Sequence, residues 1–188
     1  MLKRYVITPD CGNTEHPALF LKQLQRTLDS GIKLVQLRSK NLSSIYYMNL
    51  AKKALILCQQ YNTVLLLNTY NSISLQLSAD GLHLDSQSLM AYNKRGLPEG
   101  KLLAASCHTI EELEKAKSIK ADFVTLSPVL KTASHPDVKP LGWDGFFALA
   151  SRTTLPVYAL GGLSTDSLPH AERYGARGIA GIRCFWRS

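Results

Sequence analysis

Short apolar runs recur along the chain and alternate with segments that carry helix signals. Eight such runs, rich in leucine or β-branched residues, begin near Arg4, Lys33, Val64, Asp80, Leu102, Asp122, Pro156 and Gly178. Between the first two runs, Leu21, Leu24 and Leu28 have the spacing of one helical face. Gly31 follows as a C-terminal helix stop. The pattern therefore predicts a regular strand–helix alternation.

The later intervals carry further helix signals. One apolar stripe follows the capping candidates Ser43 and Ser44 and comprises Met48, Ala51, Leu55 and Cys58. Thr109 and Glu112 have the spacing of a capping box, with threonine at the N-cap and glutamate three residues later. The last interval begins at residues 164–166 and stops at Gly175. We expect a helix in each of these intervals.

Eight strand–helix units predict a parallel sheet, because each helix returns the chain to the same edge. A closed (β/α)8 barrel accommodates eight units better than an open flavodoxin-like sheet, which is the alternative. No low-complexity segment or linker divides residues 1–188, so we expect one barrel domain. The interval from Val64 to Asp80 has room for only a very short helix.

The run at residues 33–40 places polar side chains in the phase that faces the barrel interior. Its period of two puts Gln36, Arg38 and, if the strand continues, Lys40 on the side of Leu34. Cations that point into a barrel mouth lose hydration, and an anionic ligand would offset that cost. The alternative is that both cations have left the strand and are solvated.

In a barrel, chemistry belongs at the carboxyl ends of the strands. Polar or glycine residues follow the predicted strands there, among them Asn68, His83, Ser106, Thr132, His135, Gly161, Gly162 and Arg183. The glycine pair lets backbone N–H groups approach a phosphate, and Arg183 would be adjacent. A tight turn is the alternative for the glycines. The histidines match no recognised metal-ligand spacing, so we expect no metal centre from them.

Charge raises the question of an anionic partner. The chain has 188 residues and a formal net charge of +8. No apolar run approaches the length that spans a bilayer, and the four cysteines form no C-x-x-C pair, so we expect a cytoplasmic protein without a membrane partner. Many basic residues are scattered and are interpreted as solvated surface charge, not as a nucleic-acid site: Lys22, Arg26, Lys52, Lys53, Lys94, Arg95, Lys115 and Lys117.

Several short motifs follow one another along the chain. They are residues 35–40 (Val-Gln-Leu-Arg-Ser-Lys), 66–68 (Leu-Leu-Asn), 79–84 (Ala-Asp-Gly-Leu-His-Leu), 105–109 (Ala-Ser-Cys-His-Thr) and 156–162 (Pro-Val-Tyr-Ala-Leu-Gly-Gly). Through these motifs, the sequence from Tyr5 to Phe185 resembles the thiamine phosphate synthase/TenI family. The resemblance implies a (β/α)8 barrel. It also implies a transferase of thiamine biosynthesis, which joins hydroxymethylpyrimidine diphosphate to thiazole phosphate and releases diphosphate with help from Mg²⁺.

Carried over to this chain, the resemblance implies roles for single residues. Gln36, Arg38 and Lys40 match the pyrimidine and diphosphate segment, and Ser106 and Thr132 match further contacts near the diphosphate. We take Arg38, Lys40 and Ser106 as catalytic candidates. Substrate-binding candidates are Gln36, Asn68, His83, Thr132, His135, Gly161, Gly162 and Arg183.

The chain also departs from the synthase pattern. The two aspartates expected to bind Mg²⁺ fall on Thr69 and Ser88, so the metal is expected from the family without its usual ligands. His135 stands where a diphosphate-binding lysine is expected, and Arg183 stands where the family has serine. Asp85 is a substitute carboxylate on a different face.

These departures leave three functions open. The first is the synthase. The second is a non-catalytic or regulatory module that binds phosphorylated thiazole, pyrimidine or thiamine compounds. The third is a TenI-like thiazole tautomerase, although the catalytic histidine of that branch falls on Ser127-Pro128 here. Within the family, the sequence most resembles the synthase-like domain fused to Nudix hydrolases in some bacteria. The resemblance also implies a homo-oligomer, because family members commonly associate.

Overall fold

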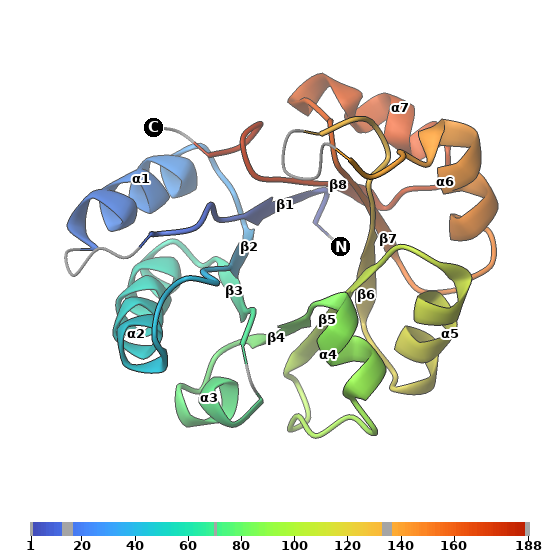
Figure 1. The fold of residues 1–188 in the computed structure, drawn as a ribbon. Coiled ribbons are helices and arrows are strands. Elements are labelled where there is room, and N and C mark those ends of the chain that lie inside the picture. The colour runs from blue at the N-terminus through green and yellow to red at the C-terminus, as the bar shows by residue number, and fades with distance from the viewer. Residues whose placement is uncertain (1, 13–16, 70, 133–136, 187–188) are drawn as a thin grey trace.

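A computed structural model of the chain describes residues 2–12, 17–69, 71–132 and 137–186. Parallel strands pair in chain order around a closed barrel, and helices surround it (Figure 1). The strands are β1 (Arg4–Ile7), β2 (Leu34–Leu37), β3 (Val64–Leu67), β4 (Gly81–Leu84), β5 (Leu102–Cys107), β6 (Phe123–Leu126), β7 (Val157–Leu160) and β8 (Gly178–Gly181). The predicted (β/α)8 barrel is therefore confirmed, and the open flavodoxin-like sheet is wrong.

The helices follow the strands in the expected order. They are α1 (Ala18–Asp29), α2 (Ser44–Gln60), α3 (Asn71–Gln76), α4 (Ser86–Ala91), α5 (Ile110–Ser118), α6 (Gly142–Ala150) and α7 (Leu168–Arg173), with a 3-10 turn η1 (Thr165–Ser167) before α7. The helix between Val64 and Asp80 is short, as predicted. The capping box of Thr109 and Glu112 is present, whereas the N-cap Ser43 makes no side-chain cap bond.

The core has two layers, which follow from the period of two along each strand. Val35 and Leu37 of β2 face outward and pack in the layer shared with the helices. Leu34 faces inward and joins a separate cluster inside the barrel with Tyr5, Ile7, Leu66, Ala104, Phe123, Tyr158 and Ala180. Aromatic rings dominate this interior; the centroids of Tyr5 and Phe123, for example, lie 5.3 Å apart. In the described part of the chain, no helix combines the length and the hydropathy needed to cross a bilayer.

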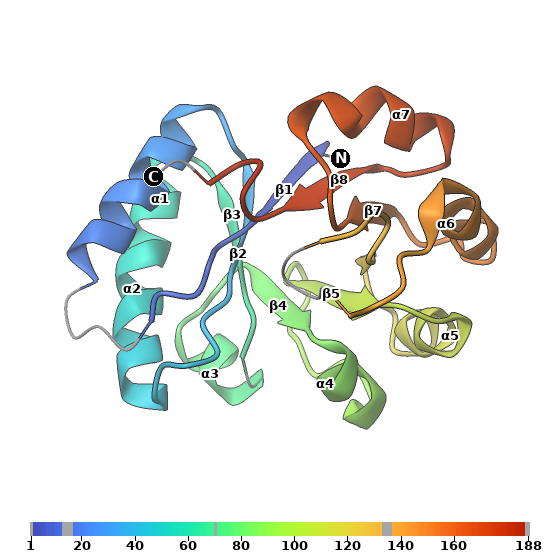
Figure 2. The same cartoon turned by 45° about the horizontal axis from the view of Figure 1, so that its top comes forward.

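Strands β1 and β8 close the barrel. Arg4 pairs with Ile179 and Tyr5 with Ala180 in parallel register. Gly178 lies so close to the backbone before β1 that a Cβ atom there would stand 2.2 Å from the carbonyl oxygen of Lys3. After β8, the chain returns to α1, where the rings of Trp186 and Phe20 have centroids 5.1 Å apart (Figures 1 and 2). This seam joins the two ends of the described chain.

Two aspartates brace the amino-terminal ends of neighbouring strands. Asp80, just before β4, accepts a hydrogen bond from the backbone N–H of Leu65 in β3 at 2.9 Å. Asp122, just before β6, accepts one in the same way from Leu103 in β5 at 2.7 Å. Each carboxylate therefore ties one strand to the strand before it.

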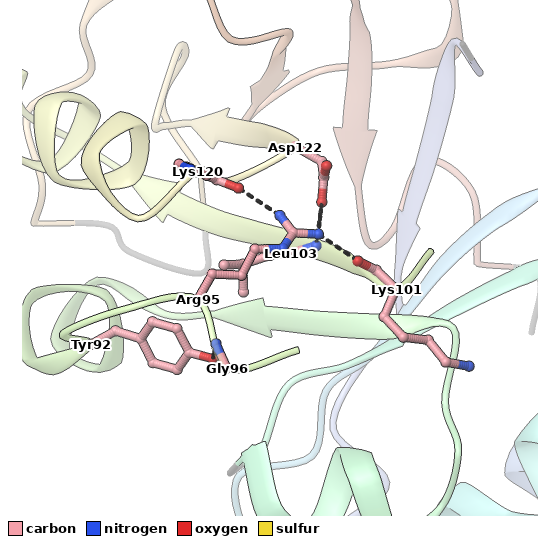
Figure 3. A network of polar contacts seen from close by, with 7 residues as sticks. All are labelled: Tyr92, Arg95, Gly96, Lys101, Leu103, Lys120 and Asp122. Atoms are coloured by element: carbon pink, nitrogen blue, oxygen red, sulfur yellow. Dashed lines mark hydrogen bonds and ion pairs between the residues drawn. The ribbon is translucent and has the colours of Figure 1, made fainter. Parts of the chain in front are cut away.

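Arg95 completes a polar network at this end of the barrel (Figure 3). Its guanidinium group donates to the carbonyl oxygens of Lys120 and Lys101 and forms a 3.0 Å ion pair with Asp122. One side chain thus joins the loop before β5, which holds Arg95 and Lys101, to the loop before β6, which holds Lys120 and Asp122. The interpretation of Arg95 as a solvated surface charge is therefore wrong.

Replacing Arg95 by methionine is expected to lower the free energy of unfolding by about 1–3 kcal/mol, because Asp122 and the carbonyl of Lys101 lose a charged donor while partly buried. Urea denaturation measures this loss. Lys94→Met removes the same charge from the neighbouring exposed position and is the control, with little expected effect. Equal stability of the Arg95 variant and the control would contradict a bracing role.

Candidate active site

A cavity of about 920 Å³ opens at the carboxyl ends of the strands. This volume lies within the range of small-molecule sites. Among the residues proposed from the sequence, it is lined by Gln36, Arg38, Lys40, Asn68, Ser106, Thr132, Gly161, Gly162 and Arg183. His83 lies beneath the cavity with 1% of its surface exposed, and His135 falls outside the described residues. The structure thus brings most of the proposed residues together.

The cavity wall is strongly cationic. Arg38, Lys40, Lys131 and Arg183 line it, and Asp85 is the sole carboxylate among the described lining residues. The two ion pairs found within the described residues, Lys3–Glu172 and Arg95–Asp122, both lie elsewhere. A concave surface with one sign of charge concentrates ligands of the opposite sign. The arrangement therefore suits an anionic small molecule.

The backbone of Arg38 is held from β1. Strand β2 ends at Leu37, so Arg38 and Lys40 lie in the loop that follows, as the alternative interpretation predicted, yet both line the cavity. The hydroxyl of the fully buried Thr8 donates to the carbonyl oxygen of Arg38 at 3.1 Å and accepts from its N–H at 3.0 Å. This two-way bond fixes the point from which the guanidinium group extends.

Asp10 holds the next part of the same loop. One carboxylate oxygen accepts from the hydroxyl of Ser39 at 2.9 Å, and the other accepts from the N–H of Lys40 at 3.1 Å. Burial opposes ionisation of this carboxyl group, but hydrogen bonds from Gly12, Ser39, Lys40 and Asn41 prevail and lower its pKa. The loop that follows β1 therefore orders the loop that carries the cations.

The loop after β7 comes close to the loop after β6. The carbonyl oxygen of Gly161 accepts from the N–H of Leu130 at 3.0 Å. Gly162 has φ +72°, and a Cβ atom there would stand 2.6 Å from the carbonyl oxygen of Lys131. Glycine is therefore required at this position, because a side chain would be strained and would also push the two loops apart.

The floor of the cavity is a chain of hydrogen bonds through the barrel interior. The amide of Asn68 donates to Gln36 at 3.3 Å, and the amide of Gln36 donates to the hydroxyl of Tyr5 at 3.1 Å. The Tyr5 hydroxyl lies 3.0 Å from Nδ1 of His83, whose Nε2 lies 2.9 Å from Oγ of Ser106. Five strands or strand ends thus contribute to one buried network.

Burial keeps His83 neutral. Loss of hydration lowers the pKa of its imidazole from 6.5 to about 3, against an opposing attraction from Asp85. The folded protein therefore binds one proton fewer than the unfolded chain at pH values between these two limits.

The contribution of His83 to the free energy of unfolding is therefore expected to be fully present above about pH 6.5. It falls as the pH drops toward 3, because in this range the unfolded chain takes up a proton at His83 and the folded protein does not. Between pH 7 and pH 4 the contribution of His83 is about 3 kcal/mol. Urea denaturation of the wild type and of His83→Gln at both pH values measures this contribution. Both proteins have the same carboxylates, so the difference between their pH dependences reports His83. An identical pH dependence in the two proteins would contradict the prediction.

His108 contributes a second oriented imidazole. Its Nδ1 lies 2.7 Å from the backbone carbonyl oxygen of Ser127, which accepts hydrogen bonds only. Nδ1 therefore carries the hydrogen, and in the neutral ring Nε2 is left as the proton acceptor. Both His108 and Ser127 line the cavity.

Several site features were not assigned from the sequence. The sequence assigned no role to Tyr5, Thr8 or Asp10, although the alternation of Tyr5 and Ile7 along β1 indicates an inward-facing tyrosine.

Asp85 accepts a hydrogen bond from the N–H of Ser88 and so caps α4. Partial burial opposes its ionisation, but the hydrogen bonds from Ser88 and the nearby charge of Lys40 lower its pKa. The carboxylate of Asp85 is thus already engaged.

Sequence comparisons with known proteins agree on one family. A sequence profile described as thiamine monophosphate synthase matches residues 4–185. A protein of Aquifex aeolicus with the provisional name thiamine-phosphate synthase 2 is 37% identical over 166 residues, which cover 88% of this chain and 89% of the relative. The thiamine-phosphate synthase of Alkaliphilus oremlandii is 32% identical over 162 residues, 86% of this chain and 78% of the relative.

A solved structure has the same fold. The thiamine phosphate pyrophosphorylase from Pyrococcus furiosus superposes with a TM-score of 0.79 and covers 96% of this chain and 85% of that protein. The sequence identity of this pair is 24%, so the similarity supports the barrel architecture alone.

Proposed function

Because the chain belongs to the thiamine monophosphate synthase family, we propose that it joins hydroxymethylpyrimidine diphosphate to thiazole phosphate and releases diphosphate. The observation that carries the proposal is the cationic cavity, where four basic side chains face one carboxylate among the described lining residues. Both substrates are phosphorylated, so both bring negative charge to this cavity. Hydroxymethylpyrimidine diphosphate also places that charge on the group that leaves.

The reaction requires stabilisation of charge more than proton transfer. The C–O bond of the pyrimidine methylene breaks, and its electron pair stays on the departing diphosphate. The thiazole nitrogen then uses its lone pair to form the new C–N bond. Preorganised cations stabilise such a leaving group in the transition state. We assign this role to Arg38 and Lys40, with Ser106 as a further contact.

The second phosphate belongs to the thiazole substrate. In our proposal it binds near Gly161 and Gly162, with Arg183 as its counter-ion. In the described structure, the N–H groups of Gly162 and Leu163 donate to no protein acceptor, which leaves them available for a phosphate oxygen. Gln36 and Asn68 are proposed to line the pyrimidine side, and Thr132 is proposed as a further contact near the diphosphate.

The described donor set does not fit a resident Mg²⁺ ion. No group of three or more metal-binding side chains was found among the described residues. Asp85, the sole described carboxylate of the cavity wall, caps α4, and the family's ligand positions are Thr69 and Ser88. We therefore derive no step through the metal and assign the neutralisation of charge to the protein's cations.

Synthase turnover with both substrates tests the proposal. We expect formation of thiamine phosphate and stoichiometric release of diphosphate, measured with and without added Mg²⁺. Turnover no faster than that of an Arg38→Ala variant would contradict the synthase. Tight calorimetric binding of thiamine phosphate without turnover would instead favour the non-catalytic or regulatory module.

One observation favours a second candidate, the thiazole tautomerase. The catalytic histidine of that branch falls on Ser127-Pro128, and His108 is hydrogen-bonded to Ser127 with Nε2 as its available base. We therefore propose His108 as the proton acceptor if the chain isomerises thiazole phosphate. Conversion of the thiazole isomer that is lost in His108→Gln would support this activity, and no conversion by the wild type would exclude it.

The family resemblance also leads us to propose a homo-oligomer and a natural association with a Nudix hydrolase domain. Light scattering of the purified chain tests the first proposal. A monomeric mass at micromolar concentration would contradict it. Sequencing of the coding region around this chain tests the association with a Nudix domain.

A further inference from the structure

The buried network at the cavity floor has a direction. In the side-chain amide of Gln36, Oε1 accepts a hydrogen bond from Asn68, so Nε2 donates one to the hydroxyl oxygen of Tyr5. Tyr5 is fully buried, and its own hydrogen needs an acceptor inside the barrel. Nδ1 of His83, 3.0 Å away, is that acceptor.

The direction continues through His83 to Ser106. An imidazole that accepts at Nδ1 and is neutral carries its hydrogen on Nε2. Nε2 therefore donates to Oγ of Ser106 over 2.9 Å. The low pKa of His83 agrees with a neutral ring throughout the physiological range.

A second donor reaches the same oxygen. The hydroxyl of Thr125 lies 3.4 Å from Oγ of Ser106 and is fully buried, so it uses its hydrogen within the barrel. Two donors then occupy the two lone pairs of the Ser106 oxygen. The hydroxyl hydrogen of Ser106 is left for a partner in the cavity, which this residue lines.

We propose that Tyr5 and His83 are positioning residues that hold the Ser106 hydroxyl as a hydrogen-bond donor toward an anionic oxygen of a phosphorylated substrate. The inference rests on the proposed function for the identity of that substrate. The polarity of the floor selects a ligand atom that accepts a hydrogen bond there. It disfavours a ligand that presents an N–H donor next to Ser106, because that donor would then face the hydroxyl hydrogen of Ser106.

Calorimetry with inorganic diphosphate tests the selection directly. Loss of a hydrogen bond to a charged group in Ser106→Ala is expected to weaken binding by about 10-fold or more. Tyr5→Phe is expected to weaken it less, because His83 can then adopt either tautomer. Tyr158→Phe is the matched control: its hydroxyl also lies in the barrel interior but donates to the carbonyl oxygen of Leu2 at the opposite end. It should leave the diphosphate affinity unchanged.

A double-mutant cycle separates positioning from packing. If Tyr5 acts through Ser106, Tyr5→Phe has no further effect on diphosphate affinity in the Ser106→Ala background. His83→Gln can still offer an N–H group to Ser106 and should retain more affinity than His83→Leu. A purely structural role would lower the melting temperature of Tyr5→Phe and leave its diphosphate affinity at the wild-type value.

Nitrogen-15 NMR of the wild-type protein reports the tautomer of His83 without any substitution. We expect the hydrogen on Nε2. A hydrogen on Nδ1, or equal effects of Tyr5→Phe with and without Ser106, would overturn the inference. If the tautomer and the coupling are found but the wild type does not turn over the synthase substrates, the proposed reaction fails while the donor role of Ser106 is supported.

Discussion

Replacing Arg38 by methionine is expected to lower the kcat/KM of synthase turnover by about 100-fold to 1,000-fold, the range typical for removal of a preorganised charge-stabilising group. The guanidinium group reaches the cavity from a backbone that Thr8 clamps on both sides. The clamp fixes the backbone from which the side chain extends, so substrate binding orders only the flexible side chain. Because Lys40 is exposed, Lys40→Met is expected to lower kcat/KM less, by about 10-fold.

Steady-state kinetics with both substrates measure these effects. Lys94→Met removes a positive charge outside the cavity and should leave kcat/KM within a factor of about two, because exposed distant charges are screened by salt. Arg38→Lys keeps the charge but loses the planar donor geometry, and partial recovery is expected. Equal activities of Arg38→Met and Lys94→Met would contradict the assignment of Arg38.

Replacing Gly178 by alanine is expected to lower the free energy of unfolding by about 3–5 kcal/mol, at the upper end of effects caused by overpacking. The new Cβ atom would lie 2.2 Å from the carbonyl oxygen and 2.7 Å from the carbonyl carbon of Lys3. Both atoms belong to the backbone, so no flexible side chain can move away. The clash would separate β8 from β1 where the barrel closes.

Urea denaturation of Gly178→Ala, or its soluble yield if it does not fold, measures this cost. Gly145→Ala is the matched control: it lies in α6, where an added Cβ would make an ordinary 3.5 Å contact with Leu141. The control should be neutral or more stable by up to about 1 kcal/mol, since alanine favours helix more than glycine does. A loss below about 1 kcal/mol in Gly178→Ala would show that the seam can adapt.

The barrel can be predicted closely from the sequence because its strands are short, buried and separated by helices with local signals. Each strand begins within one residue of its predicted position, for example at Leu34 against Lys33 and at Gly81 against Asp80. The capping box of Thr109 is a local motif and is confirmed. Ser43 has the right residue type but makes no cap bond, because residue type alone does not determine where the hydroxyl points.

Part of the candidate site can also be predicted from the sequence, because residues that follow parallel strands gather at one end of a barrel. Arg38, Ser106 and Arg183 all line the cavity for this reason. The supporting residues are harder to find. Thr8 and Asp10 act on the loop after β2 because Val6 and Ile7 pair with Val35 and Gln36, and a single sequence contains no local sign of that register.

The polar floor illustrates the same limit. Gln36 stands in the correct phase on β2, and His83 was proposed from its place at the end of β4. Their connection through Tyr5 joins residues up to 78 positions apart. The hydrogen-bond direction that determines the role of Ser106 arises from this long-range packing.

The pairing of β1 with β8 also orders events during synthesis of the chain. Every other neighbouring pair joins strands that are consecutive along the chain, whereas β1 pairs with β8, for example Arg4 with Ile179. The entropic cost of closing a loop grows only slowly with its length, so the late pairing of β1 with β8 adds little to the free energy of folding. Until β8 has left the ribosome, however, the edge of β1 opposite β2 remains unpaired, and such edges pair readily with other chains. The open edge of β1 is therefore an aggregation hazard during the synthesis of β2 to β8.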